Sequence, residues 1–306
     1  MSEASRAGVA SLRLTQRLPS PVLTSRMKIL SRAVDTRSEV RAAKLQGKRV
    51  GFVPTMGALH DGHISLIRAA KSHSNFVVAS IFVNPTQFGP NEDLAKYPRP
   101  FDTDRQKLEA ERVDLLFTPS IEEMYPTGAV TFVAAEGISD RLDGRSRPGH
   151  FRGVTTVVAK LFHIVEPDVV FFGQKDAAQA AIIKRMVRDL MFPVEIVVAR
   201  IVRESDGLAL SSRNAYLSPA ERKQATVLSR ALHEVERRYG AGERNSARLT
   251  ETAREVFAGE PSVRVDYIEI VDRDTLEAVA DASTGNLVAV AAFVGTTRLI
   301  DNIVLR

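Results

Sequence analysis

The sequence predicts an α/β protein, in which a parallel β-sheet is covered by helices on both faces, followed by a smaller α+β unit. Two observations support this prediction. Short runs of Val, Ile and Phe alternate with amphipathic helical segments through residues 48–199, which is typical of a buried parallel sheet with right-handed crossovers. From about Ser218 the pattern changes to two charged helices followed by two strands, which indicates a separate unit.

The first unit alternates strands and helices in a regular order. Five segments are short, apolar and rich in β-branched or aromatic residues, as strands are: Lys48–Pro54, Phe76–Val83, the run VDLLFTP from Val113, the run DVVFFG from Asp168, and Pro193–Ala199. One helix lies between the first two strands, and the later ones cover Thr103–Arg112, Val154–Val165 and Ala177–Leu190. In such a sheet, ligands bind at the carboxyl ends of the strands.

The second unit contains two predicted helices, Pro219–Tyr239 and Ser246–Phe257, and two predicted strands, VRVDYIEIV and NLVAVAAFV. The segment Arg203–Pro219 joins the units, and its Gly, Ser and Asn residues are typical of a loop. We therefore divide the chain into residues 1–26, 27–203 and 204–306.

Composition excludes several classes of protein. With 306 residues, 44% hydrophobic and 26% charged, the chain resembles an ordinary globular protein. No apolar run approaches the roughly 18 residues that a membrane span needs, so we expect no membrane association. The absence of cysteine removes disulfides and thiolate catalysis, and it suits the reducing cytoplasm, where we expect the protein to be located.

The net charge of +5 is concentrated at the start of the chain. Residues 1–26 contain four arginines and one acid, Glu3, a net charge of +3 that leaves +2 for the other 280 residues. The nearly neutral body disfavours a nucleic-acid partner. The basic segment lacks the apolar core of a secretory signal, and we expect either a disordered extension or a natural start at Met27.

The stretch PTMGALHDGHISLIRAA, Pro54–Ala70, places His60 and His63 where a strand becomes a helix. Their spacing puts both on one helix face, and the free N–H groups of a helix N-terminus attract anionic oxygens. Gly57 and Gly62 would let phosphates approach the backbone. Two alternatives stay open: one histidine caps the helix while the other packs, or the pair binds a metal, for which no third ligand is nearby.

Two common phosphate-binding signatures are missing. The chain contains neither G-x-G-x-x-G nor G-x-x-x-x-G-K-[ST], so a dinucleotide-binding fold of the usual kind and a P-loop kinase lose their main support. A nucleotide would have to be held in another way.

Six motifs occur in the order of a known family. The element PTMGALHDGH resembles the HIGH-type nucleotide-binding element of the adenylate-forming superfamily. The other five motifs are FVNPTQF, RPGHFRGVTTVVAKL, FFGQKDAAQ, GLALSSRNAYLS and GTTRLIDN. From about Met27 to its end, the chain thereby resembles the pantothenate synthetase family, also called pantoate–beta-alanine ligases.

The resemblance implies an activity and an architecture. It implies an ATP-dependent ligase that condenses D-pantoate with beta-alanine, giving pantothenate, AMP and diphosphate through a pantoyl-adenylate, with Mg²⁺ accompanying the ATP. It implies a cytoplasmic homodimer with a Rossmann-like nucleotide- and pantoate-binding domain at residues 27–203 and a C-terminal lid at residues 204–306. The alternatives are another HIGH-motif nucleotidyltransferase or a non-catalytic nucleotide-binding regulator; a tRNA-binding role is disfavoured.

The resemblance also assigns residues. Those expected to be catalytic are His60, His63, Lys175, Ser211, Ser212 and Arg213. The same residues are expected to bind ATP, together with Met56, Gly57, Gly173 and Asp176. Those expected to bind pantoate are Pro54, Met56, Asn84, Gln87, Phe88, Val157, Val158 and Gln179. Asp176 is the expected magnesium ligand, since magnesium usually takes one or two carboxylates plus phosphates and waters.

These residue types fit the chemistry. Phosphoryl transfer depends on donors and cations that meet developing negative charge, while the hydroxyls and geminal methyls of pantoate need amides on one side and apolar groups on the other. Without the motifs, Lys175 would be read as a solvated lysine, Asp176 as a helix cap, and SSRN as a polar turn.

Four positions depart from the family pattern. Gln174 and Asp143 stand where Glu is usual, and Ala177 and Ala178 replace an aromatic residue and a glutamine. Because Asp is one methylene shorter than Glu, the contact made from position 143 is in question. We expect the chemistry to survive and the substrate affinity to differ.

Overall fold

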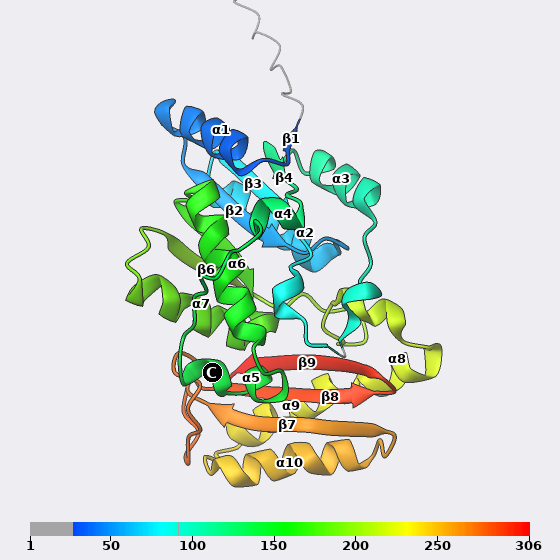
Figure 1. Ribbon diagram of the computed structural model, residues 1–306. Coiled ribbons are helices and arrows are strands. Elements are labelled where there is room, and N and C mark those ends of the chain that lie inside the picture. The colour runs from blue at the N-terminus through cyan, green and yellow to red at the C-terminus, as the bar shows by residue number, and fades with distance from the viewer. Residues whose placement is uncertain (1–26, 91) are drawn as a thin grey trace, which may run out of the picture.

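The computed structural model describes residues 27–90 and 92–306, and the extension predicted for residues 1–26 lies outside this range. In the described residues, a six-stranded parallel sheet has the strand order β1-β4-β3-β2-β5-β6 (Figure 1). Its strands are β1 (Lys28–Leu30), β2 (Val50–Thr55), β3 (Phe76–Ile81), β4 (Leu115–Phe117), β5 (Val169–Gly173) and β6 (Glu195–Ala199). The predicted parallel sheet is confirmed.

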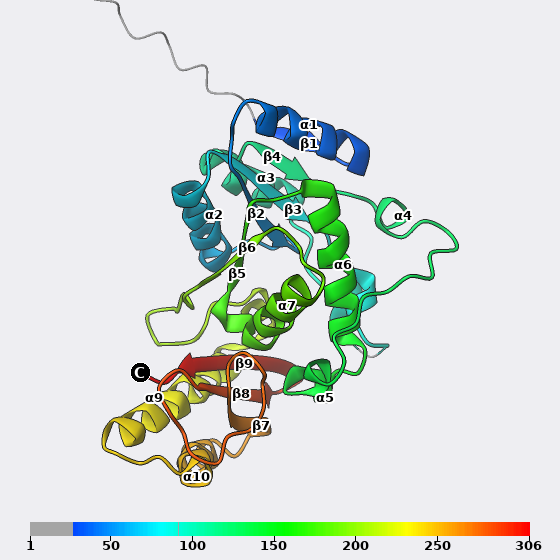
Figure 2. The ribbon, with the colours of Figure 1, turned by 90° about the vertical axis from the view of Figure 1, so that its left-hand side faces the viewer.

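Helices cover both faces of this sheet, as predicted, and Figure 2 shows α2 and α6 on opposite sides. One face carries α2 (Asp61–His73) and α3 (Phe101–Ala110). The other face carries α1 (Ala33–Leu45), α6 (His150–Val165) and α7 (Ala177–Asp189). None of the helices in residues 27–90 and 92–306 is long and apolar enough to cross a membrane.

The strand β5 shows why its sequence is apolar throughout. Val169 and Phe171 join the core beneath α2 and α3, whereas Val170 and Phe172 join the core beneath α1, α6 and α7. Successive side chains of a strand point to opposite faces. A strand buried on both faces therefore loses the alternation of polar and apolar residues.

Several short elements carry no periodic pattern, and the sequence did not predict them. They include β1, α4 (Ile121–Met124) and α5 (Asp143–Ser146), and the 13-residue helix α1 was also not predicted. Five 3₁₀ turns also belong to this group: η1 (Pro85–Gln87), η2 (Asp93–Ala95), η3 (Ile138–Asp140), η4 (Gln174–Asp176) and η5 (Ser212–Tyr216). Three of these turns, η1, η4 and η5, carry predicted site residues.

The C-terminal unit is an antiparallel sheet of order β7-β8-β9 with helices on one face. Its elements are α8 (Pro219–Ala225), α9 (Val227–Gly240), α10 (Ser246–Ala258), β7 (Val263–Val271), β8 (Leu287–Val294) and β9 (Thr297–Val304). The prediction of one helix over Pro219–Tyr239 was wrong. It breaks at Thr226, whose N–H and hydroxyl both donate to the carbonyl of Lys223. The strand β9, which pairs with β8 across a two-residue turn, was missed.

The C-terminal sheet is buried on both faces. Leu287, Ala289 and Ala291 of β8 belong to the core that extends into the first unit. Val288 and Val290 belong instead to the core beneath α9 and α10. One of the apolar cores therefore spans both units, and in Figure 1 the sheet lies between the first unit and α10.

Candidate active site

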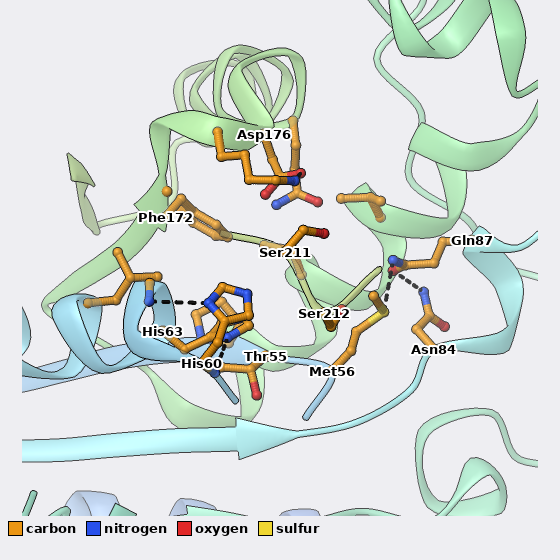
Figure 3. Close-up of a pocket in the computed structure, with 18 of the residues that line it drawn as sticks. Thr55, Met56, His60, His63, Asn84, Gln87, Phe172, Asp176, Ser211 and Ser212 are labelled. Atoms are coloured by element: carbon orange, nitrogen blue, oxygen red, sulfur yellow. Dashed lines mark hydrogen bonds and ion pairs between the residues drawn. The ribbon is translucent and has the colours of Figure 1, made fainter. Parts of the chain in front are cut away.

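A cavity of about 230 Å³ opens at the carboxyl ends of β2 and β5, between the two units. It brings together nearly all the residues predicted from the sequence: Pro54, Met56, His60, His63, Asn84, Gln87, Phe88, Val157, Val158, Gly173, Lys175, Asp176, Gln179, Ser211, Ser212 and Arg213 (Figure 3). Gly57 is the exception. It does not line the cavity, and a Cβ built there would meet Asp104 and Ile81.

The histidine pair begins helix α2. The Nδ1 atom of His60 accepts a hydrogen bond from the N–H of Gly62 (3.2 Å), and Nδ1 of His63 accepts one from the N–H of His60 (3.3 Å). A Cβ at Gly62 would lie 2.8 Å from the His60 ring, so glycine is needed here to leave room for the cap. Both histidines cap the helix, and both line the cavity.

Burial keeps both imidazoles neutral. It lowers the pKa of His60 to about 4, with the charge of Lys175 adding to the effect. Burial, then His60 and Lys175, lowers the pKa of His63 to about 3. Since each Nδ1 accepts a backbone N–H, the ring proton sits on Nε2. The pair therefore offers the cavity two neutral Nε2–H donors rather than two cations.

A lysine and a carboxylate stand at the end of β5. Lys175 and Asp176 lie on η4, with Nζ of Lys175 3.7 Å from Oδ1 of Asp176. The Asp176 side chain makes no capping hydrogen bond to α7, so the alternative of a helix cap is not observed. The residues that the structure describes contain no cluster of three or more metal-ligating side chains. A magnesium ion here would depend on phosphates and water as well as on Asp176.

The amide of Gln87 is held in a defined orientation. Nδ2 of Asn84 donates to Oε1 of Gln87 (3.0 Å) (Figure 3). Tyr125 donates to Oδ1 of Asn84 (2.8 Å). Because Oε1 is occupied, the Nε2 group of Gln87, 3.2 Å from the sulfur of Met56, is the donor left for the cavity. Asn84 is almost fully buried and bonded within the protein, so its geometry favours orienting Gln87 over contacting a ligand.

Close packing of α6 brings this amide to the cavity. A Cβ at Gly153 would collide with the carbonyl of Thr86 and lie 2.7 Å from Cα of Gln87. Only glycine allows α6 to approach η1 this closely. The same helix contributes Val157 and Val158 to the cavity wall, and α7 contributes Gln179.

The sequence predicted no role for Arg147 and His150, although both belong to the family motif that begins RPGHF. Arg147 forms a two-pronged ion pair with Glu92 (2.7 and 2.6 Å). His150 donates from Nδ1 to the carbonyl of Gln87 (2.8 Å), because its Nε2 faces the guanidinium of Arg147 (3.0 Å). Burial and the charge of Arg147 lower the pKa of His150 to about 4. Nη2 of Arg147 also donates to the carbonyl of Gln87 (3.3 Å), so both residues hold the backbone of the Gln87 turn.

Asp104 and Lys107 were also missed. The buried carboxylate of Asp104 accepts the N–H groups of Ala58 and Leu59 at 2.7 Å each, and Lys107 donates to the carbonyl of Leu59. The two side chains project from α3 and hold the loop that leads to His60. Nothing local in the sequence distinguishes them from the other charged residues of that helix.

The segment Ser211–Arg213 closes the cavity from the C-terminal side. Arg213 forms an ion pair with Asp93 through Nε (3.0 Å) and Nη2 (2.9 Å). The hydroxyls of Tyr97 and Ser212 are 3.3 Å apart. The predicted phosphate-binding segment is therefore docked on the turn η2 and the residues that follow it.

The contact from position 143 is now defined. Asp143 accepts a hydrogen bond from Nη1 of Arg298 on β9 (2.8 Å), and both side chains are largely buried. Arg298 also pairs with Asp266 of β7. The shorter acid therefore ties the first unit to the C-terminal sheet and lines a small recess beside the main cavity.

The fold and this site define a nucleotide-binding α/β enzyme with donors for phosphate on one side and an amide-lined pocket on the other. The family is identified by comparison: residues 28–304 match the model described as pantoate-beta-alanine ligase. The chain belongs to the pantoate-beta-alanine ligase family, and it is a ligase that joins pantoate to beta-alanine. The resemblance stated from the sequence is confirmed.

Relatives and solved structures agree. The chain is 56% identical over 280 residues to the pantothenate synthetase of Koribacter versatilis, covering 92% of this chain and 96% of the relative. The Acidobacterium capsulatum enzyme is 58% identical over 289 residues, covering 90% and 97%. These relatives do not support a non-catalytic regulator or a different nucleotidyltransferase.

Among solved structures, pantothenate synthetase from Thermus thermophilus superposes with a TM-score of 0.87 at 47% identity, covering 90% of this chain and 99% of that one. Pantoate-beta-alanine ligase from Francisella tularensis, a complex with beta-gamma ATP and beta-alanine, gives 0.75 at 35% identity, covering 91% and 97%. The predicted fold class is thereby confirmed.

Proposed function

We propose that this cavity carries out both steps of the ligase reaction. ATP would lie with its phosphates at the start of α2, and pantoate would lie against η1 and α6. The carboxylate of pantoate attacks the α-phosphorus and releases diphosphate, and the amine of beta-alanine then attacks the acyl carbon and releases AMP. The observation that supports this most is that phosphate donors and an oriented amide face the same cavity.

On the phosphate side, His60 and His63 donate from Nε2 to oxygens that gain negative charge as the bond to pantoate forms. Lys175 adds a positive charge, and the segment Ser211–Arg213 adds hydroxyl and guanidinium donors. Preorganised donors of this kind supply most of the catalysis in nucleotidyl transfer. Met56 and Gly173, which line the same cavity, would contact the nucleotide.

On the pantoate side, Gln87 and Gln179 donate to the hydroxyl and carboxylate oxygens. Asn84 orients Gln87 and does not contact the acid itself. The geminal methyl groups lie against the apolar residues of the wall, which are Pro54, Met56, Phe88, Val157 and Val158. Holding the acid at this wall places its carboxylate toward the phosphates.

Asp176 fits a magnesium ion that accompanies ATP. Its carboxylate lines the cavity and makes no helix cap, and hard oxygen ligands are what this ion prefers. A bound magnesium ion would neutralise part of the phosphate charge. Lys175, whose Nζ lies 3.7 Å from Oδ1 of Asp176, balances the charge of that carboxylate.

The homodimer and the cytoplasmic location expected from the resemblance belong to the same proposal, as does the lid role of residues 204–306. Three large apolar side chains stand exposed on the segment that begins at α4 and extends away from the body in Figure 2: Ile121, Val130 and Phe132. A second copy would remove this surface from water. Light scattering after gel filtration tests the dimer, and a Phe132→Ser variant tests the surface.

Isotope exchange between diphosphate and ATP tests the assignment of the steps. We expect exchange to require D-pantoate and to proceed without beta-alanine, because activation of the acid precedes attack by the amine. The Lys175→Ala variant should exchange slowly, whereas Lys184→Ala, on the outer face of α7, should exchange normally. Exchange that requires beta-alanine would contradict a free adenylate, and full exchange in Lys175→Ala would contradict the placement of the phosphates.

A further inference from the structure

Asn302, on strand β9 of the C-terminal unit, is bonded to the turn that carries Lys175. Its Nδ2 group donates to the carbonyls of Gln174 and Lys175, both at 2.9 Å. Its Oδ1 accepts a hydrogen bond from Nε2 of Gln174 (3.3 Å). The side chain is almost completely buried, and both amide hydrogens are used.

The two carbonyls flank one residue. The carbonyl of Gln174 belongs to the peptide before Lys175, and the carbonyl of Lys175 belongs to the peptide after it. Fixing both peptide planes fixes the backbone dihedral angles between them, and therefore the direction in which the Lys175 side chain leaves the backbone. No side-chain cap within the turn can replace these two hydrogen bonds. The N-cap residue of η4 is Gly173, which has no side chain, and the Asp176 side chain does not cap α7.

Asn302 is itself held in place. Its N–H donates to Oδ1 of Asp301 (2.7 Å), a buried carboxylate that forms a two-pronged ion pair with Arg203 (2.6 and 2.9 Å). Arg203 also donates to the carbonyl of Gly207 (3.0 Å), four residues before Ser211. The lysine turn is thus anchored to Asn302, and the loop that leads to the phosphate-binding segment is anchored through Arg203 to Asp301, the neighbouring residue of β9.

We propose that Asn302 is a positioning residue for adenylation: it sets the direction of Lys175 toward the phosphates of ATP. The proposal rests on the proposed role of Lys175. It assigns a function to Asn302, the last residue of the family motif GTTRLIDN. It also means that the C-terminal sheet contributes to the phosphate site without reaching the ligand.

The substitution Asn302→Asp tests this with almost no change of shape. A carboxylate has no hydrogen to donate, so it would face two carbonyl oxygens and release the turn. The matched control is Asn286→Asp. Asn286 is also buried in the C-terminal unit, but its side chain is used as an acceptor: Oδ1 receives hydrogen bonds from the N–H and hydroxyl of Ser283. If Asn302→Asp does not fold, Asn302→Ser, which is too short to reach both carbonyls, replaces it.

Three readouts separate positioning from loss of stability. In Asn302→Asp we expect single-turnover adenylation to slow by about 10- to 100-fold, the scale of a misplaced reacting group. The dissociation constant for ATP should rise, while that for pantoate, measured by calorimetry, should stay within twofold. In a Lys175→Ala background, adding Asn302→Asp should cause little further loss, because the group that it positions is gone.

The outcomes distinguish the two proposals. A normal adenylation rate in Lys175→Ala alone would overturn the placement of the phosphates at Lys175 in the proposed function. A slow Lys175→Ala enzyme in which Asn302→Asp causes a full additional loss would overturn the positioning role and leave the proposed function standing. The positioning role would also be wrong if Asn302→Asp, or Asn302→Ser in its place, adenylated pantoate at the wild-type rate.

Discussion

The guanidinium of Arg213 is paired with the carboxylate of Asp93, with donor–acceptor distances of 3.0 and 2.9 Å. Burial opposes ionisation of Asp93, but the hydrogen bond and charge of Arg213 prevail and lower the pKa of that carboxyl. Arg213, the cation of the segment proposed to bind phosphate, is therefore already paired with a carboxylate. ATP must compete with Asp93 for Arg213 or bind beside the pair.

We expect Asp93→Asn to bind ATP about two- to fivefold more tightly, because it removes both the competing partner and a negative charge near the phosphates; partly exposed ion pairs are worth roughly 0.2–1 kcal/mol. Calorimetry with a non-hydrolysable ATP analogue measures this. Asp189→Asn, which breaks a comparable arginine pair far from the cavity, should change nothing. Weaker binding in Asp93→Asn would mean that Asp93 holds Arg213 in its binding position.

Two substitutions of His60 separate its role as the cap of α2 from its proposed role as a hydrogen-bond donor to the phosphates. The amide oxygen of Asn can replace Nδ1 as the cap of α2, whereas the amide nitrogen of Gln can replace the Nε2–H donor. We expect His60→Asn to keep wild-type stability but to slow adenylation by roughly 100-fold, the scale for losing one preorganised donor. His60→Gln should lose about 1 kcal/mol of stability, the usual value of a cap, yet adenylate faster than His60→Asn.

Urea unfolding and single-turnover kinetics on the two variants provide the comparison. Equal rates in both would show that the Nε2–H group of His60 is not used. Equal and undiminished stability would show that the cap contributes nothing to α2. The same pair of substitutions applies to His63, whose Nδ1 accepts the N–H of His60.

Stability should fall in mild acid because three histidines are buried in neutral form. The pKa values are lowered to about 4 for His60, 3 for His63 and 4 for His150, whereas an unfolded histidine titrates near 6.5. Below about pH 6.5 the unfolded chain binds protons that the folded protein does not. The stabilisation is therefore complete above pH 6.5 and is lost progressively as the pH falls toward 4 and 3.

His60→Asn removes one of these groups and keeps the cap. Between pH 7 and pH 5 its free energy of unfolding should fall less than that of the wild type, by roughly 1–2 kcal/mol. Urea titrations at the two pH values measure the difference. As a control, His233 is exposed on α9, and His233→Asn should lose as much stability as the wild type between the two pH values. If His60→Asn also loses as much stability as the wild type, His60 is protonated in the folded protein at pH 5.

Selectivity for the acid should depend on its hydroxyl more than on its methyl groups. A substrate without the hydroxyl leaves a buried amide unpaired, which costs about 1–3 kcal/mol, whereas the loss of one methyl costs about 0.8 kcal/mol. We expect the deoxy analogue of pantoate to be adenylated less efficiently than the monomethyl analogue. The gap between pantoate and its deoxy analogue should shrink in Gln87→Ala or Gln179→Ala; an unchanged gap in both would place the pantoate pocket on other residues.

The sequence alone determined the features that depend on neighbouring residues. The alternation of apolar strands with amphipathic helices specified the parallel sheet, because burial on both faces demands continuous apolar runs. The strand-to-helix spacing around His60 and His63 placed the pair at a helix N-terminus. Family motifs then gathered Lys175, Gln87 and the segment 211–213 into one predicted site.

Only the tertiary structure decided how these groups are held and which atoms they present. Asp104 reaches Leu59 across 45 positions of sequence, and Asn302 reaches Lys175 across 127. Such contacts leave no periodic signal, because a buried donor or acceptor is chosen by what folds against it and not by its neighbours in the chain. The neutral state of the histidines has the same origin, since burial and nearby charges that lower a pKa exist only once distant segments have packed together.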